Sequence, residues 1–540
     1  MDNVSYLDYK GKHKGLLGWI LSTDHKRIAI LYLVSLIIFF LVAMTFGFLM
    51  RLEMLSPGKT IIDPQTYNAL FTLHGVIMIF LFIIPGIPAV FGNFFLPIML
   101  GAKDVSFPRL NLLSWYFYIG GAVLVLLSLF VGGGPIDTGW TFYVPYSLRT
   151  QTNVSLAVFA AFVLGFSSIL TGLNFIVTIH RMRCPGMGWF KMPLFAWGLY
   201  STSWIQVLAT PIIGITLLLI ILERFFGVGI FDPALGGDPL LYQHLFWIYS
   251  HPAVYIMILP AMGLVSEIIP TFSKKDIFGY GPIAMSSLAI AFLGYLVWGH
   301  HMFSSGIGDT SRAIFSFLTF IVAIPTGIKV FNWVATLYKA SIDARAPFWF
   351  VVAFIIIFSI GGLTGLVLGS LNTDIHLTDT YFVVAHFHYV MFGGMGLLFF
   401  GGLHYWFSKM FGKMYNEKIA KLGTLIFVIG FNGLYFPMFI MGYLGMPRRY
   451  YDYLPQYQIY HVISTIGSWV LIIGILILIF NLLKALLSKS NTTTELNPWG
   501  GTTLEWTVPT PPPLENFDVI PTVTHGPYYR PNLIKPEKSH

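Results

Sequence analysis

Two histidines, His386 and His388, stand two positions apart inside an otherwise apolar run. An α-helix turns about 100° per residue, so the two imidazoles point to roughly opposite sides of one helix. Polar groups deep in hydrocarbon are costly and usually serve a function. The spacing therefore predicts that one helix serves two neighbouring sites. The alternative is a pair of histidines bound to backbone groups in a helix bundle.

Four more histidines, His74, His251, His300 and His301, lie within or at the ends of other apolar runs. Neutral imidazole is the commonest nitrogen ligand for iron and copper. The adjacent pair can converge on one ion if His251 faces it. Three imidazoles without thiolate or carboxylate suit copper, although zinc would also accept them. Tyr255 follows His251 by four positions and shares its helical face, which makes it either a donor of electrons and protons or a core tyrosine.

The elements that hold these residues are predicted to be membrane spans. The chain has 540 residues, of which 56% are hydrophobic and 10% charged, and its mean hydropathy is +0.74. A soluble protein would be about a quarter charged, so we expect an all-α polytopic membrane protein. The lone Cys184 excludes a disulfide framework or a thiolate metal cluster built by this chain alone.

Apolar runs of about twenty residues predict twelve transmembrane helices. They cover residues 27–50, 71–100, 111–132, 154–179, 193–222, 243–269, 281–303, 313–338, 347–370, 381–409, 419–444 and 459–488. The expected organisation is an N-terminal segment 1–26, a twelve-helix catalytic domain 27–488 and a C-terminal tail 489–540. An even number of spans places both termini on one side.

Basic residues are distributed unequally between the two sides. Of the 31 lysines and arginines, 20 lie in segments on the side of the termini, three more in the C-terminal tail, seven in segments on the other side and one, Lys329, within a span. Because positive charge favours the cytoplasmic side, both termini are expected to be cytoplasmic. Topology thus explains the net charge of +8, and nucleic acid is not an expected partner.

Taken in order and spacing, His74, His251-Pro-x-Val-Tyr255, His300-His301 and His386-Phe387-His388 resemble subunit I of the haem-copper terminal oxidases. The resemblance runs from about Asp24 to the Asn497-Pro498-Trp499-Gly500 motif, nearly the whole chain. It implies the helix arrangement of that family and the reduction of dioxygen to water, coupled to proton translocation.

The same resemblance implies a role for each ligand. The low-spin haem a would be held by His74 and His388, the high-spin haem a3 by His386, and copper B by His251, His300 and His301. Tyr255 would be cross-linked to His251, and Phe387 would lie between the haems.

It also implies roles for residues around the haems. Arg51 would hydrogen-bond the low-spin haem, and Arg448 and Arg449 would grip haem propionates, because the planar guanidinium binds carboxylates in a bidentate manner. Two further ion sites are implied: Asp379 for magnesium, and Glu53 with Gly58 for sodium or calcium. The magnesium motif departs from the family, which commonly has His-Asp where this chain has Thr378-Asp379.

Two proton routes follow from the resemblance. One would begin at Asp104, with a polar lining of Asn93, Asn111, Ser167, Ser168 and Asn174. The second, the lysine channel, would comprise Lys329, Thr326, Ser266 and Tyr255.

The first route departs from the commonest family pattern at its inner end. The usual glutamate of His-Pro-Glu-Val-Tyr is replaced by Ala253. Tyr249 and Ser250 lie four and three positions earlier, on the same helical face. This resembles the A-type branch that uses a Tyr-Ser pair instead, and the consequence for pumping is left open.

The electron donor is expected to be cytochrome c. Gln65-Thr66-Tyr67-Asn68 resembles the cytochrome c branch, and Val42 and Phe46 occupy positions where the quinol branch has arginine and aspartate. Expected partners are a subunit II carrying a dinuclear copper centre, a subunit III, and cytochrome c acting directly or through a fused or associated cytochrome domain.

The expected location is the bacterial plasma membrane. The alternatives are a quinol oxidase of the same family and a twelve-span proton-coupled transporter. A nitric-oxide reductase is the nearest enzyme rival, but it is expected to lack Tyr255 and Lys329.

Overall fold

The computed structural model describes residues 4–9, 11, 13–493 and 495–530. Four basic residues of the charge pattern, Lys10, Lys12, Lys535 and Lys538, lie outside the described residues. In the described part of the chain the regular structure is helical, and extended segments pair only in three isolated bridges. The all-α prediction is confirmed.

The long helices follow one another along the whole chain. Those that form the bundle are α2 (His25–Glu53), α3 (Pro64–Val76), α4 (Asn93–Met99), α5 (Pro108–Leu127), α7 (Val154–Arg181), α8 (Leu194–Phe226), α9 (Pro239–Ser273), α10 (Tyr280–Gly294), α11 (Asp309–Leu337), α12 (Ala346–Gly369), α14 (Tyr381–Val390), α15 (Leu397–Phe411), α16 (Glu417–Tyr443) and α17 (Gln458–Leu487). Short helices α1 (Gly15–Ile20), α6 (Tyr146–Arg149) and α13 (Leu371–Leu377) lie in the connections.

Within the described ranges, eleven helical segments are long and apolar enough to cross a membrane. Each corresponds to one of the predicted spans, and the twelfth prediction falls on the shorter apolar helix α10. Residues 281–303 do not form one continuous span. α10 ends at Gly294, and a separate 3-10 turn, η5 (Trp298–Met302), carries the adjacent histidines. A Cβ at Gly294 would lie 2.6 Å from Cδ2 of Tyr255, so a side chain here would collide with that phenol.

Two spans contain wide π-helical turns that the sequence did not reveal. α3 continues through η1 (Ile77–Ile83) and η2 (Gly86–Gly92) into α4, and α14 continues through η6 (Met391–Gly396) into α15. Such turns are rare and often occur at functional sites. They directly follow His74 in the first span and His388 in the second.

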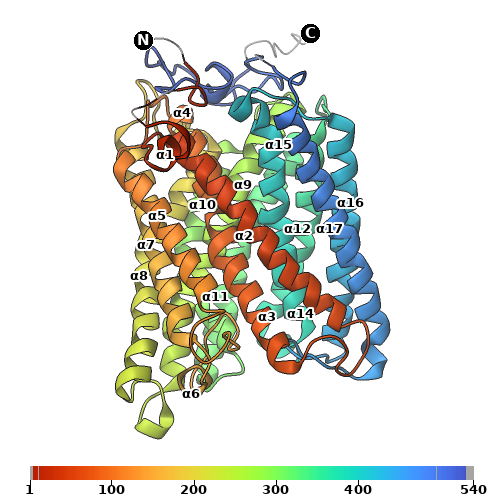
Figure 1. The fold of residues 1–540 in the computed structure, drawn as a ribbon. Helices are drawn as coiled ribbons and strands as arrows, with labels where there is room; N and C mark the ends of the chain where they lie inside the picture. The colour runs from red at the N-terminus through yellow and green to blue at the C-terminus, as the bar shows by residue number, and fades with distance from the viewer. Residues whose placement is uncertain (1–3, 10, 12, 494, 531–540) are drawn as a thin grey trace.

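The helices run side by side in a single bundle (Figure 1). Among the eleven spanning segments α9 has the most enclosed apolar stretch, 89% of it buried, and it packs against α8, α10, α11 and α12. α14 packs against α12 and α16. The histidine-bearing segments therefore come from the interior of the bundle.

The described segments near the two ends of the chain lie at one end of the bundle, the upper end in Figure 1. The amide of Tyr6 donates to the carbonyl of Pro512 at 3.1 Å, and Ser5 bridges Pro513. Both terminal segments thus lie on one side of the bundle. The described tail contains one 3-10 turn, η8 (Leu504–Trp506), and otherwise turns, bends and irregular backbone.

Candidate metal centre

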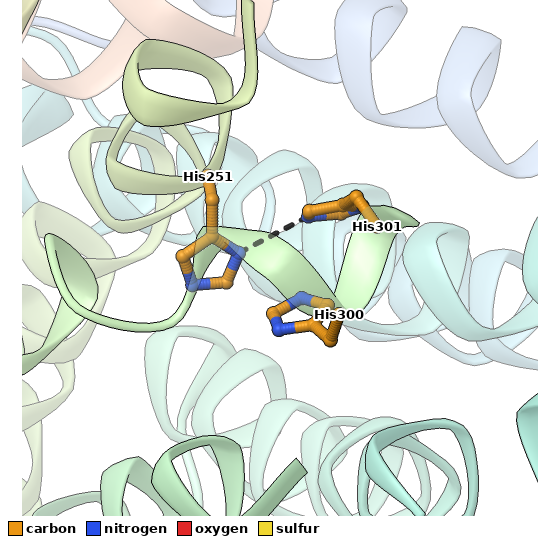
Figure 2. Close-up of side chains that lie close together, drawn as sticks. All are labelled: His251, His300 and His301. Carbon is orange, nitrogen blue, oxygen red and sulfur yellow. Dashed lines mark hydrogen bonds between the residues drawn. The ribbon is translucent and has the colours of Figure 1, made fainter. Parts of the chain in front are cut away.

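Three imidazoles converge from two segments far apart in the sequence. His251 comes from α9, and His300 and His301 come from η5 (Figure 2). One ligand nitrogen from each lies within 4.8 Å of the other two. Nδ1 of His251 and Nε2 of His301 are 3.1 Å apart, so the rings present nitrogen atoms to one small volume.

The three imidazoles converge although His300 and His301 do not lie on the α-helix that the predicted span 281–303 implied. His300 and His301 lie on a 3-10 turn, where successive residues differ by about 120° rather than 100°. Their orientation is fixed by neighbours instead. Trp247 stacks on His301 at 3.7 Å between ring centroids, and Nδ1 of His300 lies 3.0 Å from the hydroxyl of Thr319.

The phenol of Tyr255 completes this cluster. Its hydroxyl lies 3.0 Å from Nε2 of His251, one helical turn away. The i, i+4 spacing read from the sequence therefore places phenol and imidazole in direct contact.

The remaining histidines are each oriented by a backbone carbonyl. Nδ1 of His74 donates to Ala43 at 2.7 Å, and Nδ1 of His388 donates to Val384 at 2.8 Å. His386 makes the same contact with Gly361 at 2.9 Å. Because a carbonyl only accepts, Nδ1 carries the proton and Nε2 presents a lone pair. This is the tautomer that an axial ligand of haem iron requires, so the donor set fits the group.

His386 and His388 meet different neighbours. His386 contacts Gly361 and Thr364 of α12, whereas His388 stacks on Tyr435 of α16 at 4.2 Å. Phe387 lies against His388 at 4.5 Å. One short helix thus presents its two imidazoles to two separate parts of the interior.

A further buried histidine, His461, was not among the predicted site residues. One guanidinium nitrogen of Arg51, Nη2, lies 3.3 Å from Nδ1 of His461 and donates to its carbonyl and to Thr465. Arg51 is thereby held between α2 and α17. The sequence could have pointed to this residue, because a histidine inside a predicted span is a candidate functional residue and His461 lies inside the span 459–488.

The adjacent arginines lie in the loop between α16 and α17. Arg448 forms an ion pair with Asp379, at 2.8 Å. Arg449 has φ of +68° and lies over the ring of Phe71. Burial and the neighbouring Arg448 lower the pKa of Arg449 to about 10. A buried guanidinium beside a second cation favours an anionic partner, and haem propionates would supply one.

The residues expected to hold smaller cations fit them less well. The carboxylate of Glu53 accepts hydrogen bonds from the amides of Thr60, Ile61 and Ile62, an environment of donors that suits no cation. The amide of Gly58 donates instead to Asp452. The structure therefore gives no support to sodium or calcium here. A magnesium ion at Asp379 would have to share that carboxylate with Arg448.

The polar residues of the first proton route form an interrupted line from the end of the bundle that carries both termini. Asp104 is half-buried in the loop before α5, and Asn174 bonds both backbone groups of Phe107 in that loop. Both side-chain amide atoms of Asn111 are buried without a hydrogen-bond partner. The carbonyl of Asn93 contacts His25 at 2.6 Å.

Two small cavities continue the line toward α9. The first, of about 30 Å³, is lined by Ser167, Ser168 and Gln206, among others, and the second, of about 20 Å³, by Ser168, Thr210 and Tyr249. Each has room for at least one water molecule. Tyr32, which the sequence did not single out, joins Ser167 to Ser114 at 3.0 Å each.

The inner end of this line reaches the pair upstream of Ala253. Tyr249 is 3% exposed and lines the second cavity. The hydroxyl of Ser250 is buried without a partner. Ala253 follows Tyr249 by four positions and Ser250 by three, so the three residues lie toward one face of α9.

The second expected route is less continuous. The ammonium group of Lys329 is buried and donates to Ser287 at 2.7 Å and to the carbonyl of Ile283 at 3.0 Å, both on α10. Thr326 donates to its own helix, and Ser266 accepts from Trp333. Ser287, rather than Thr326, is thus the polar neighbour of the lysine.

Comparison with known proteins is consistent with this site. The family model described as cytochrome c and quinol oxidase polypeptide I matches residues 27–470. Cytochrome c oxidase subunit 1 of Thermostichus vulcanus is 44% identical over 508 residues, covering 94% of this chain and 91% of the relative. The Bacillus subtilis protein of the same name is 41% identical over 512 residues, covering 94% and 82%.

A solved structure, a heme-copper terminal oxidase dimer studied by cryo-electron microscopy, shares the fold. Its TM-score is 0.69 at 22% identity, with 87% of this chain and 85% of that chain covered. The chain therefore belongs to the cytochrome c and quinol oxidase polypeptide I family. It is subunit I of a terminal oxidase, a multi-pass membrane oxidoreductase of the haem-copper class.

Proposed function

We propose that this chain is the catalytic subunit of a bacterial cytochrome c oxidase that reduces dioxygen to water and translocates protons. The observation that carries the proposal is the convergence of His251, His300 and His301 within 4.8 Å, with Tyr255 in contact. A haem-copper centre at this place would supply the four-electron reduction of dioxygen.

The proposed metal ligands follow the resemblance, and the lone-pair Nε2 atoms of His74, His386 and His388 support them. His74 and His388 would hold the low-spin haem a, His386 the high-spin haem a3, and His251, His300 and His301 copper B. Tyr255, 3.0 Å from His251, would donate a proton and an electron and would be cross-linked to that ring. Arg448 and Arg449 would bind propionates, and Arg51 would contact the low-spin haem.

The electron donor is proposed to be cytochrome c, acting through a dinuclear copper centre on a subunit II. Cys184, buried beside Gly101, cannot build such a centre by itself. A subunit III and a fused or associated cytochrome domain are the further proposed partners. A quinol oxidase remains the alternative, although Val42 and Phe46 replace the charged pair of that branch.

The proposed topology places both termini and Asp104 on the cytoplasmic side of a bacterial plasma membrane. In support, the described terminal segments lie at one end of the bundle and most basic loop residues share that end. Segments 1–26 and 489–540 would flank the membrane domain 27–488. Protons would then enter from the cytoplasm at Asp104.

The branch with a Tyr-Ser pair is proposed for the inner end of that route. Tyr249→Phe removes only the hydroxyl that faces the second cavity. In reconstituted vesicles we expect this change to abolish proton ejection while leaving at least half of the oxygen uptake. The physical reason is that Tyr249 is the one residue of α9 that lines the second cavity.

Tyr242→Phe is the matched control, because its hydroxyl, on the same helix, donates to the carbonyl of Thr141 at 2.7 Å and lines neither cavity. Ejection per electron should be unchanged in this variant. Normal ejection by Tyr249→Phe would refute the assignment of the pair. A natural chain that consumes oxygen without ejecting protons would refute pumping altogether.

A carbon-monoxide difference spectrum tests the alternative of a proton-coupled transporter. The purified natural chain should show haem absorption bands that shift with carbon monoxide, which a transporter would not.

A further inference from the structure

The C-terminal tail crosses the mouth of the first proton route. Asn516 is 1% exposed, although it lies in a surface segment with φ of +61°. An asparagine tolerates this backbone conformation, which most L-residues adopt only with strain. A buried polar side chain in such a conformation is held there by specific contacts.

The side chain of Asn516 joins three segments. Its Nδ2 donates to the carbonyls of Ala102 and Lys103, at 2.9 and 3.0 Å, in the loop that carries Asp104. The same nitrogen lies 3.0 Å from Nε2 of His25, and its Oδ1 accepts from Lys26 at 2.9 Å. One amide thus connects the tail, the loop and the start of α2.

Lys26 is fully buried at this junction. Its ammonium group also donates to Asp24 and to the carbonyl of Leu514, both at 2.9 Å. A buried ammonium needs such partners, because its desolvation is otherwise costly. Two of its acceptors belong to the tail, so the tail contributes to holding this charge beside Asp104.

The charged groups that act on Asp104 come from the start of α2, and the adjacent Lys103 is paired with the tail. Asp24 and Lys26 lie at the start of α2, and Lys103 pairs with Glu515 of the tail at 2.5 Å. Burial, with the charge of Asp24, raises the pKa of Asp104 to about 7. A carboxyl whose pKa is raised toward neutrality is suited both to take up and to release protons.

We propose that Asn516 is a positioning residue of the proton entrance, by which the tail holds the Asp104 loop against Lys26. The inference rests on the proposed role of Asp104 in proton uptake. The tail is then part of the proton-translocating machinery, and not only a covering of the helix ends.

The test uses Asn516→Gly in the complete oxidase. Glycine keeps the positive φ without strain, so only the side-chain bonds are lost. Release of the loop should admit water to Asp104 and favour its charged form. The infrared band of the Asp104 carboxyl is identified by its loss in Asp104→Asn. In Asn516→Gly the pH midpoint of this band should then be lower by about one unit. Proton ejection per electron at pH 7 should fall at least twofold.

Asn497→Ala is the matched control, because this tail asparagine bonds only Gly501 within the tail. It should change neither the infrared titration nor ejection. If Asn516→Gly does not assemble, Asn516→Ser removes the amide nitrogen and its two donations to the loop without adding a charge, and the same shift is expected.

Two failures are distinguishable. If Asp104→Asn leaves proton ejection unchanged, the proposed entrance itself is wrong. If Asp104→Asn abolishes ejection while the assembled Asn516 variant matches the natural chain in both measurements, the role of the tail is overturned.

Discussion

Replacement of His301 by Asn is expected to remove copper from the purified oxidase and to lower oxygen uptake at least about 100-fold. Losing a partner outside the ligand shell often costs 10- to 100-fold in metal affinity or activity, and a direct ligand should cost no less. His301 is one of only three converging imidazoles in the described chain, so no neighbour can replace it. Copper per haem, measured on the purified protein, checks the prediction.

The low-spin haem provides an internal control in the same sample. His74 and His388 lie outside the three-histidine cluster, so the low-spin band should persist if the variant folds. His404→Asn is the matched substitution, because that histidine is fully buried in α15 and bonds only its own helix through Nδ1. It should retain copper. A His301→Asn variant with full copper content would show that the metal lies elsewhere.

Lys329→Met is expected to lower oxygen uptake by about 100-fold, the scale on which a positioned proton donor or acceptor contributes. Methionine preserves most of the volume and removes the ammonium group. That group is buried and bonds only Ser287 and the carbonyl of Ile283 among the contacts of this structure. Lysine can change its protonation state when buried, which a relay requires. Stopped-flow reduction should show a slow high-spin haem and an unaffected low-spin haem.

Thr326→Val tests whether the neighbouring hydroxyl belongs to the same route. It donates to the carbonyl of Val322 in its own helix, so we expect less than a twofold change in uptake. Ser287→Ala should have the larger effect, because it removes the nearest hydroxyl to the ammonium group. The opposite order would restore the route expected from the sequence.

Much of the fold could be predicted because its determinants are local. A run of about twenty apolar residues must form a helix in lipid, where every backbone group needs an internal partner. The break after Gly294 within residues 281–303 was less predictable, since Gly294 lies against the phenol of Tyr255 from another helix. The π-turns after His74 and His388 likewise left no pattern in the sequence.

In the candidate site, too, some features could be predicted from the sequence and others could not. The sequence supplied the residue types and the spacing of His251, Tyr255, His300 and His301, and hence the donor set. It could not supply the contact between Arg51 and His461, residues 410 positions apart, or the link through Tyr32. It also favoured a cation at Glu53, where the tertiary structure directs three backbone amides to the carboxylate.

By itself, then, the sequence determined the membrane class, eleven of the twelve predicted spans and the residue types of the candidate ligands, because hydrophobic length and residue identity are carried by neighbouring positions. Only the tertiary structure decided which polar groups meet, as with Lys329 and Ser287 or Asn516 and the Asp104 loop. These contacts join segments tens to hundreds of residues apart, and they form because a buried polar group must find a partner wherever packing places one.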